Sequence, residues 1–183
     1  MKELALHILD ICNNSVDAGA SWIEITIDEA TKPDHIIIAI GDNGKGMDSE
    51  MSSRVEDPWF TTRTTRKQGL GIPLIKQQAI TSGGSFRIES EPGEGTTVLA
   101  SFLKESVDRQ PMGDLAGVLL ILSGTSKEIR VVMNYLTETG SWRFDTDEIK
   151  SVLETEQITG NGLTVALREM IEYNVGELNP EAY

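Results

Sequence analysis

Residues 10–20 read DICNNSVDAGA, and this stretch decides the fold. It ends an apolar stripe in which hydrophobic residues recur at spacings of three and four from Leu4 to Val16. That periodicity predicts a helix over about residues 2–18. Gly19 predicts where the helix ends, because glycine readily takes the conformation that closes a helix.

Three glycine-rich segments follow in a fixed order. They read GDNGKGM at 41–47, GLG at 69–71 and GEGTT at 93–97. Each alone has an ordinary explanation as a turn or a helix end. Together with residues 10–20 they predict a pocket that holds a nucleotide by its base at one end and by its phosphates at the other. The alternative is a protein with chance turn motifs, which requires four independent coincidences in order.

Hydrophobic patterning predicts the other elements. Alternation at 22–27 and an apolar run at 35–40 predict two strands of an antiparallel hairpin. A short helix is expected near Asp48, a polar loop at 54–68, a helix at about 69–80, and strands at 85–90 and 96–102. Further along, we expect a helix or a buried strand at 114–122, strands at 129–135 and 142–144, and helices at 146–153 and about 163–173.

Composition changes near residues 106–113, where Asp, Arg, Gln, Pro and Gly cluster. We therefore predict a first domain over 1–104, a linker over 105–113 and a small α+β domain over 114–183. The first domain is predicted to bind the nucleotide, and the role of the second is not indicated by its sequence.

The net charge of −13 limits the classes of partner. Residues 1–104 hold 10 Lys and Arg against 15 Asp and Glu, and residues 105–183 hold 6 against 14, so both parts are acidic. Nucleic-acid binding normally needs a basic face, so neither nucleic acid nor anionic lipid is an expected partner. No apolar run approaches the roughly 20 residues of a membrane span. The single Cys12 suggests a reducing compartment, most simply the cytoplasm.

Asp42 is the candidate anchor for the base. A carboxylate at the end of an apolar strand can accept a hydrogen bond from the exocyclic amine of adenine, whereas guanine presents an oxygen there, which selects against it. Gly44 and Gly46 allow the backbone to approach the purine. Met47 ends this segment and completes the predicted contact set. The alternative is a β-turn that needs no ligand.

The first helix carries the candidate metal and catalytic residues. Asp10 and Asn14 lie one turn apart on one face. The amide oxygen of Asn14 is a hard, neutral ligand suited to Mg²⁺ already bound to phosphates. Asp10 can orient or deprotonate an attacking water or hydroxyl, or reach the metal through water. Asp17 can support either the site or the strand at 22–27. An ordinary polar helix face is the alternative.

The candidate phosphate site combines a helix start with basic residues. Gly69, Leu70 and Gly71 open a helix, whose N-terminal N–H groups and dipole favour phosphate. The cations Arg63, Arg66 and Lys67 precede it and can add charge-assisted contacts. A solvated basic loop is the alternative.

Thr97 is the last candidate, because its hydroxyl can bond the base directly or share a water with Asp42, although threonine is also a common strand residue. His7 precedes Asp10 by one turn, and a partly buried helix histidine is the favoured interpretation over a phosphoacceptor or a general base. Neither His7 nor His35 has metal-ligand spacing, so we do not expect zinc.

The ordered set resembles the GHKL superfamily of gyrase, heat-shock chaperone, histidine kinase and mismatch-repair ATPases. Residues 10–20 resemble its N box with Asn14 at the Mg²⁺ position, residues 42–46 and 69–71 resemble its two glycine boxes, and residues 93–97 resemble its closing strand. Residues 57–63, DPWFTTR, are similar to the phenylalanine box of sensor histidine kinases. The match spans about residues 1–104. It implies an α+β fold, a two-layer α/β sandwich with a mixed sheet covered on one face by helices, and ATP between the helices and a lid at about 54–68.

Two branches of the superfamily compete. The N box is similar to the mismatch-repair version, whereas the phenylalanine box and the compact lid resemble histidine kinases, which we favour. Hydrolysing members usually carry Glu where this chain has Asp10, whose reach is about one methylene shorter. No helix resembles the dimerising phosphoacceptor helix of histidine kinases, so a kinase of this kind needs an acceptor on another protein.

Three functions therefore remain open. The leading one is a kinase-like protein that binds Mg-ATP and transfers the γ-phosphoryl to a partner protein. The others are an ATP-gated interaction module with little turnover, and a slow ATPase that forms a homodimer when ATP binds.

Overall fold

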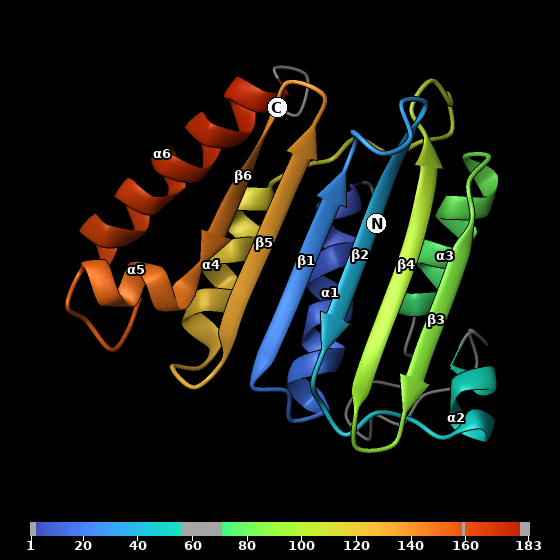
Figure 1. Ribbon diagram of the computed structural model, residues 1–183, viewed down its shortest axis with the longest axis horizontal. Helices are drawn as coiled ribbons and strands as arrows, with labels where there is room; N and C mark the ends of the chain where they lie inside the picture. The colour runs from blue at the N-terminus through green and yellow to red at the C-terminus, as the bar shows by residue number, and fades with distance from the viewer. Residues whose placement is uncertain (1–2, 56–70, 159, 180–183) are drawn as a thin grey trace.

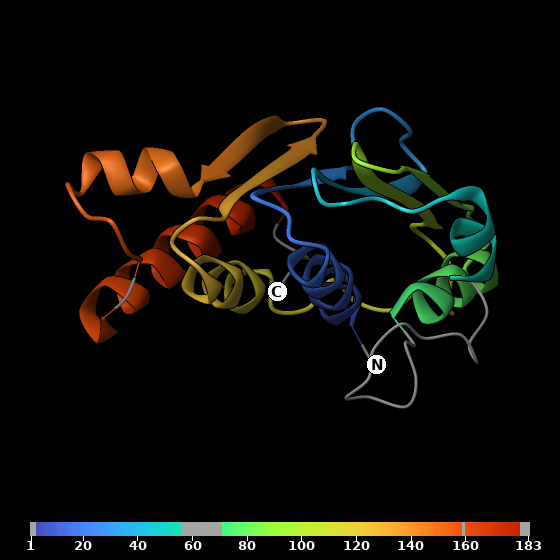
Figure 2. The ribbon, with the colours of Figure 1, turned by 90° about the horizontal axis from the view of Figure 1, so that it is seen from below.

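The computed structural model describes residues 3–55, 71–158 and 160–179 (Figure 1). One six-stranded sheet has the strand order β3-β4-β2-β1-β5-β6. Helices α1, α3, α4 and α6 lie on one face of it, and no helix of the described residues covers the other, open face (Figure 2). The predicted two-layer arrangement, with a mixed sheet and helices on one face, is confirmed.

The elements begin and end close to the predicted limits. In chain order they are α1 (Leu4–Asp17), β1 (Trp22–Asp28), β2 (His35–Asp42), α2 (Ser49–Arg54), α3 (Gly71–Thr81), β3 (Phe86–Glu91), β4 (Gly95–Leu103), α4 (Leu115–Thr125), β5 (Arg130–Thr137), β6 (Gly140–Asp145), α5 (Thr146–Val152) and α6 (Asn161–Leu178). The strand pair β1 and β2 is the predicted antiparallel hairpin.

The core lies between the sheet and its helices. Along β1 buried and half-buried residues alternate, so Ile23, Ile25 and Ile27 point to the helices. From α1, Leu4 and Ile8 pack against this surface with no exposed area. Full burial of each such side chain contributes roughly 1.5–3 kcal/mol, so the apolar stripe of α1 fixes the helix on the sheet.

Strands β5 and β6 extend the same sheet. Strand β5 pairs in parallel with β1, and β6 pairs antiparallel with β5. The chain leaves β4 at Leu103 and returns through α4 before β5 begins at Arg130. The sheet is therefore continuous across the predicted boundary at 105–113, and the division into two domains stays a prediction.

The sequence predicted either a helix or a buried strand at 114–122, and the structure has a helix at residues 115–125. The Asp114 side chain caps it by accepting a hydrogen bond from the Gly117 amide, and the same carboxylate pairs with Arg168 of α6. Capping of this kind stabilises a helix by about 1 kcal/mol. Asp114 thus starts α4 and ties it to α6.

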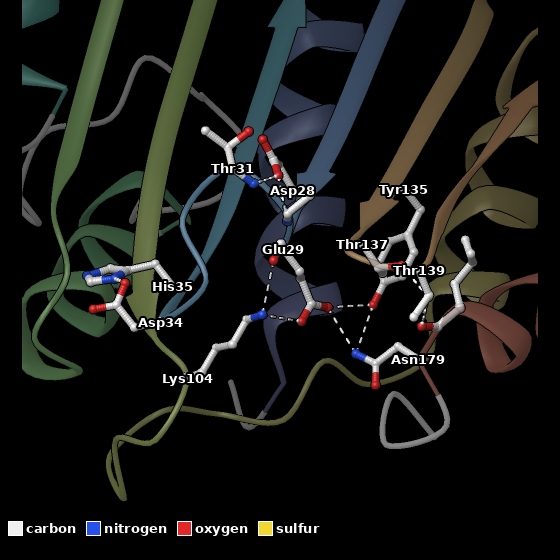
Figure 3. Close-up of polar contacts among 12 residues, drawn as sticks. Asp28, Glu29, Thr31, Asp34, His35, Lys104, Tyr135, Thr137, Thr139 and Asn179 are labelled. Atoms are coloured by element: carbon white, nitrogen blue, oxygen red, sulfur yellow. Dashed lines mark hydrogen bonds and ion pairs between the residues drawn. The ribbon is translucent and has the colours of Figure 1, made fainter.

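A buried polar cluster joins Asn179, the residue after α6, to the sheet (Figure 3). Glu29, which follows β1 and is 7% exposed, lies 3.4 Å from the Lys104 amine. Its Oε1 accepts hydrogen bonds from the Tyr135 hydroxyl at 2.7 Å and from the Asn179 amide at 2.9 Å. Because removing one partner of a buried charge costs several kcal/mol, this cluster holds Asn179, directly after α6, against the ends of β1, β4 and β5.

Of the helices in the described ranges, none has both the length and the apolar character that a membrane crossing requires.

Candidate functional site

Asp42 ends β2 and its carboxylate is held by two hydrogen bonds. The Ser15 hydroxyl donates to Oδ2 at 2.6 Å, and the Gly44 amide donates to Oδ1 at 2.8 Å. A carboxylate offers about four acceptor positions, so two bonds fix its orientation and leave acceptor capacity for a ligand. Asp42 is half-buried, which strengthens any hydrogen bond it accepts.

Ser15 is a member of the site that the sequence did not indicate. It is buried on α1, directly after Asn14. Its bond to Asp42 fixes the rotation of α1 relative to the end of β2. Serine inside a helix usually bonds its own backbone, and Ser15 also contacts the Ile11 carbonyl at 3.4 Å, so its residue type alone gives no signal of this role.

Cys12 lies deeper in the same region. Burial is the main cause that raises the pKa of its thiol, and the negative charge of Asp42 raises it further. The thiol therefore stays protonated and unreactive, as expected for a small core residue.

The glycines after Asp42 allow the loop 41–47 to contact the end of α1 and the end of β3. A side chain at Gly44 would lie 2.9 Å from the Ala18 Cβ at the end of α1. Gly46 has φ +63°, and a Cβ there would lie 1.9 Å from the Glu91 carbonyl oxygen. The loop 41–47 therefore packs tightly between the end of α1 and the turn before β4.

Met47 and Ser90 make the next contact along this loop. The Met47 amide donates to the Ser90 hydroxyl at 2.8 Å. The same hydroxyl bonds the Gly95 carbonyl at 2.9 Å and lies 2.8 Å from the Thr96 hydroxyl. Met47 is thus joined by hydrogen bonds to the strand that closes the site.

The register of β4 separates Thr97 from this cluster. Thr97 pairs with Gly41, and Thr96 pairs with Asp42. Successive side chains of a strand point to opposite faces, so Thr96 shares the helix-covered face with Asp42 and Thr97 lies on the open face. A Cβ at Gly41 would lie 3.6 Å from the Thr97 hydroxyl, in agreement with that placement. The threonine that the structure brings beside Asp42 is Thr96.

Asp10 and Asn14 lie half-buried on α1, one turn apart, as the sequence predicted. Gly71, the first residue of α3, faces Asp10 so closely that a Cβ there would lie 3.2 Å from the Asp10 Cβ and 3.5 Å from Oδ2. The structure therefore brings together α1, the start of α3 and the end of β2. Asp17 is the exposed last residue of α1.

Arg63, Arg66, Lys67, Gly69 and Leu70, together with most of the predicted lid at 54–68, lie outside the described residues. Gly71 begins α3 within one turn of the predicted start. Its backbone amide is one of the N-terminal groups that a helix leaves without an intrahelical partner.

His7 is a buried histidine of α1, one turn before Asp10. It is 2% exposed, its Nε2 lies 2.9 Å from the Gln110 side-chain oxygen, and its Nδ1 has no hydrogen-bond partner in the described part of the chain. Burial is the main cause that lowers the pKa of His7 below its ordinary value near 6.5. The ring is therefore neutral in the folded protein at pH 7.

Acidification should weaken the folded state through His7. Because its pKa is lower when folded than when unfolded, the unfolded chain binds the proton first as pH falls below about 6.5, and stability declines from there to the lowered folded value. Urea unfolding of wild type and His7→Gln at about pH 7.5 and pH 5 measures this. Wild type should lose stability relative to the variant at the lower pH; a difference that does not change with pH contradicts it.

Comparison with known proteins identifies the family. The model of the family described as histidine kinase-, DNA gyrase B-, and HSP90-like ATPase matches residues 2–106. Sensor histidine kinase YxdK of Bacillus subtilis (strain 168) is 35% identical over 107 residues, which is 56% of this chain and 33% of that protein. Sporulation kinase C of the same strain is 30% identical over 95 residues, which is 52% of this chain and 22% of that protein.

The chain thus spans a third or less of the length of these two relatives. A crystal structure of the N-terminal domain of a DNA repair protein is also similar, with TM-score 0.49 and 18% identity over 79% of this chain and 52% of that one. The family model covers more than half of this chain, including Asn14, Asp42 and the glycine-rich segments at 41–47 and 93–97. The chain belongs to the family of histidine kinase-, DNA gyrase B- and HSP90-like ATPases.

Proposed function

We propose that this chain binds Mg-ATP between α1, the end of β2 and the start of α3, and transfers the γ-phosphoryl group to a partner protein. The observation that carries the proposal is the fixed carboxylate of Asp42, held by Ser15 and the Gly44 amide at the edge of a glycine loop. The histidine kinases among its relatives support the kinase side of the family.

Asp42 would recognise adenine by its exocyclic amine. The Ser15 hydroxyl and the Gly44 amide already hold the carboxylate in place, so little ordering remains to be done when the base binds. The oxygen that guanine presents at this position would face another acceptor, and a buried polar group without a partner costs about 1–3 kcal/mol. Thr96, beside Asp42 on the same face, would support the base in place of Thr97.

Asn14 and Asp10 would act at the phosphate end. Amide and carboxylate oxygens are the hard ligands that Mg²⁺ accepts while it holds phosphates, so the oxygens that these two half-buried residues carry on one face of α1 fit that ion. Bound Mg²⁺ would neutralise charge on the phosphates. Gly71 at the start of α3, and Gly69 and Leu70 before it in the sequence, would donate backbone amides, and Arg63 and Lys67 would add positive charge.

Asp10 would orient the attacking group. Gly71 lies so close to Asp10 that the Asp10 carboxylate is beside the N-terminus of α3, where phosphate is expected. Since catalysis of phosphoryl transfer rests largely on positioning and charge neutralisation, a short carboxylate suits an acceptor side chain that a partner delivers. The shorter reach of Asp10 also favours one alternative, an ATP-gated interaction module with little turnover.

Labelled ATP separates these two functions. Wild type and Asp10→Asn are incubated with γ-labelled ATP and with the proteins that copurify with this chain, and label is followed on protein and in free phosphate. Wild type should label a partner, whereas Asp10→Asn should not, although its ATP affinity should change less than about threefold. Tight ATP binding without label on any partner contradicts the transferase and leaves the gated module.

The two adjacent threonines should differ in their effect on binding. Thr96→Val removes a hydroxyl on the Asp42 side of the sheet and should weaken ATP binding about tenfold, the loss expected for one hydrogen bond to a buried site. Thr97→Val changes the same atoms on the open face and should leave affinity within about twofold. Calorimetric titration with Mg-ATP measures both. A larger loss for Thr97→Val would contradict the assignment.

A further inference from the structure

Strand β3 is the outermost strand at one edge of the sheet. Ser85 and Ser101 exchange both backbone hydrogen bonds, at 3.3 and 2.8 Å. Such pairs alternate along an antiparallel ladder, so Arg87 and Glu89 continue the series that bonds to β4. The N–H and C=O groups of the alternate residues Phe86, Ile88 and Ser90 therefore point away from the sheet. Within the described residues no hydrogen bond engages these outward groups.

A groove lies beside the last part of this edge, at residues 88–92. Its volume is about 780 Å³, and Met47, helix α2 and strand β3 line it. Three serines of α2, at 49, 52 and 53, face residues 88–92 across it. Figure 1 shows α2 beside the end of β3. Because α2 forms a second wall, this part of the edge lies in a slot. A single extended strand fits such a slot, whereas the edge of another helix-covered sheet is too wide for it.

The three glutamates and two arginines of α2 and β3 leave a net charge of −1 around the slot. Glu89 and Glu91 line it from β3, and Glu50 of α2 lies nearby on the chain. Both arginines of these elements already pair with glutamates, Arg54 with Glu50 at 3.6 Å and Arg87 with Glu89. Opposite charges across neighbouring strands stabilise a sheet, each pair by roughly 0.2–1 kcal/mol.

We propose that this slot binds an extended, basic segment of a partner protein, which adds to the sheet beside β3. The segment alternates Lys or Arg with small apolar residues. Its basic side chains lie on the open face beside Glu89 and Glu91, and its apolar ones lie on the side of Ile88 and Met47. The outward backbone groups of Phe86, Ile88 and Ser90 supply the new ladder, as in other cases of strand addition.

The slot is separate from the proposed nucleotide site, but the loop 41–47 connects the two. Met47 lines the slot and also ends the loop that contains Asp42. The Met47 amide donates to Ser90, whose neighbours along β3 form the slot edge. The proposal does not depend on ATP, so its test uses the protein without nucleotide.

The test follows amide hydrogen exchange by NMR while the full chain is titrated with the peptide acetyl-Ser-Lys-Val-Lys-Val-Lys-Ser-amide. In the free protein the amides of Phe86, Ile88 and Ser90 should exchange faster than those of Arg87 and Glu89. Saturating peptide should slow exchange of those three by at least tenfold. A control peptide with proline at both valines keeps the charge, cannot form the strand, and should give no such protection.

Two variants test the contacts. Ile88→Pro removes the central outward N–H without removing a bond to β4, and Glu91→Lys reverses charge on the slot; each should weaken peptide binding at least tenfold. Glu177→Lys makes the same charge change on the exposed surface of α6 and should have no effect. If Ile88→Pro does not fold, Glu91→Lys still decides the charge prediction.

Three results would overturn the proposal. The first is unchanged exchange at Phe86, Ile88 and Ser90 in about 1 mM peptide, which excludes even weak binding. The second is equal binding by the proline control peptide, which would show attraction of charge alone. The third is protection of the same amides that rises with protein concentration in the absence of peptide, which would assign the edge to a second copy of this chain.

Discussion

Asp42→Asn should lower ATP affinity by about 100-fold or more, because the substitution removes an acceptor at the point of base recognition and introduces a donor. The carboxylate accepts from Ser15 and from the Gly44 amide. An amide in its place accepts only through its one oxygen. If its NH₂ group replaces Oδ1, that group faces the Gly44 N–H, and if it replaces Oδ2, the Ser15 hydroxyl must turn to accept from it. Either orientation leaves one oxygen fewer to accept from the amine of adenine.

The control for this change is Asp28→Asn. Asp28 also ends a strand of the sheet, and its Oδ1 accepts from the amides of Ala30 and Thr31 at 2.9 Å. It lies at the opposite end of the β1–β2 hairpin from Asp42. Calorimetry with Mg-ATP should show unchanged affinity for Asp28→Asn. Equal losses for the two variants would mean that Asp42 acts through general stability instead of contact with the base.

Gly95→Ala should destabilise the fold by several kcal/mol and abolish ATP binding with it. Gly95 has φ +115°, and a Cβ there would lie 1.9 Å from the Asp42 carbonyl oxygen and 3.0 Å from the Asn43 Cα. These neighbours are backbone atoms, which cannot move aside as the end of a side chain can. Relief of the clash would separate β4 from β2 at the position of Asp42.

Gly93 provides the matched control in the same turn. Its φ is +84°, but no atom lies within 4 Å of a Cβ placed on it. Gly93→Ala should therefore cost only the conformational penalty of a left-handed residue, roughly 1–2 kcal/mol. Urea unfolding of the two variants measures the difference. A cost for Gly93→Ala as large as that for Gly95→Ala would exclude the close packing as the cause.

Local patterns in the sequence predicted most elements. Alternation gave β1, and the apolar stripe of α1 gave both the helix and the shared face of Asp10 and Asn14. Residues 115–122 were ambiguous, because a continuous apolar run has neither the period of a strand nor that of a helix. The buried side chains of α4 face both the sheet and α6, which explains the absence of a polar stripe.

The sequence alone did not predict which residues far apart in the chain pair with one another. The parallel contact of β1 with β5 joins strands on the two sides of the predicted boundary, and no local signal specifies it. Glu29 and Asn179 lie far apart in the chain and meet only after α6 has packed. Long-range contacts of this kind depend on tertiary packing, which overrides local preference.

The structure adds two details to the candidate site that the sequence did not indicate, the positions of Thr96 and Ser15. Thr97 and Thr96 differ by one position, and a shift of one residue along a strand exchanges its faces. The sequence GEGTT does not specify which threonine pairs with Asp42, because the turn that sets the register depends on Gly95 packing against the Asp42 backbone. Ser15 was missed because its partner is on another element.

Calorimetric titration of the wild-type chain with ATP and with GTP, each with Mg²⁺, tests the central claim most directly. A carboxylate that recognises the adenine amine should bind ATP at least about 100-fold more tightly than GTP. Equal affinities, or no heat with ATP, would contradict the assignment of Asp42 as the anchor of the base.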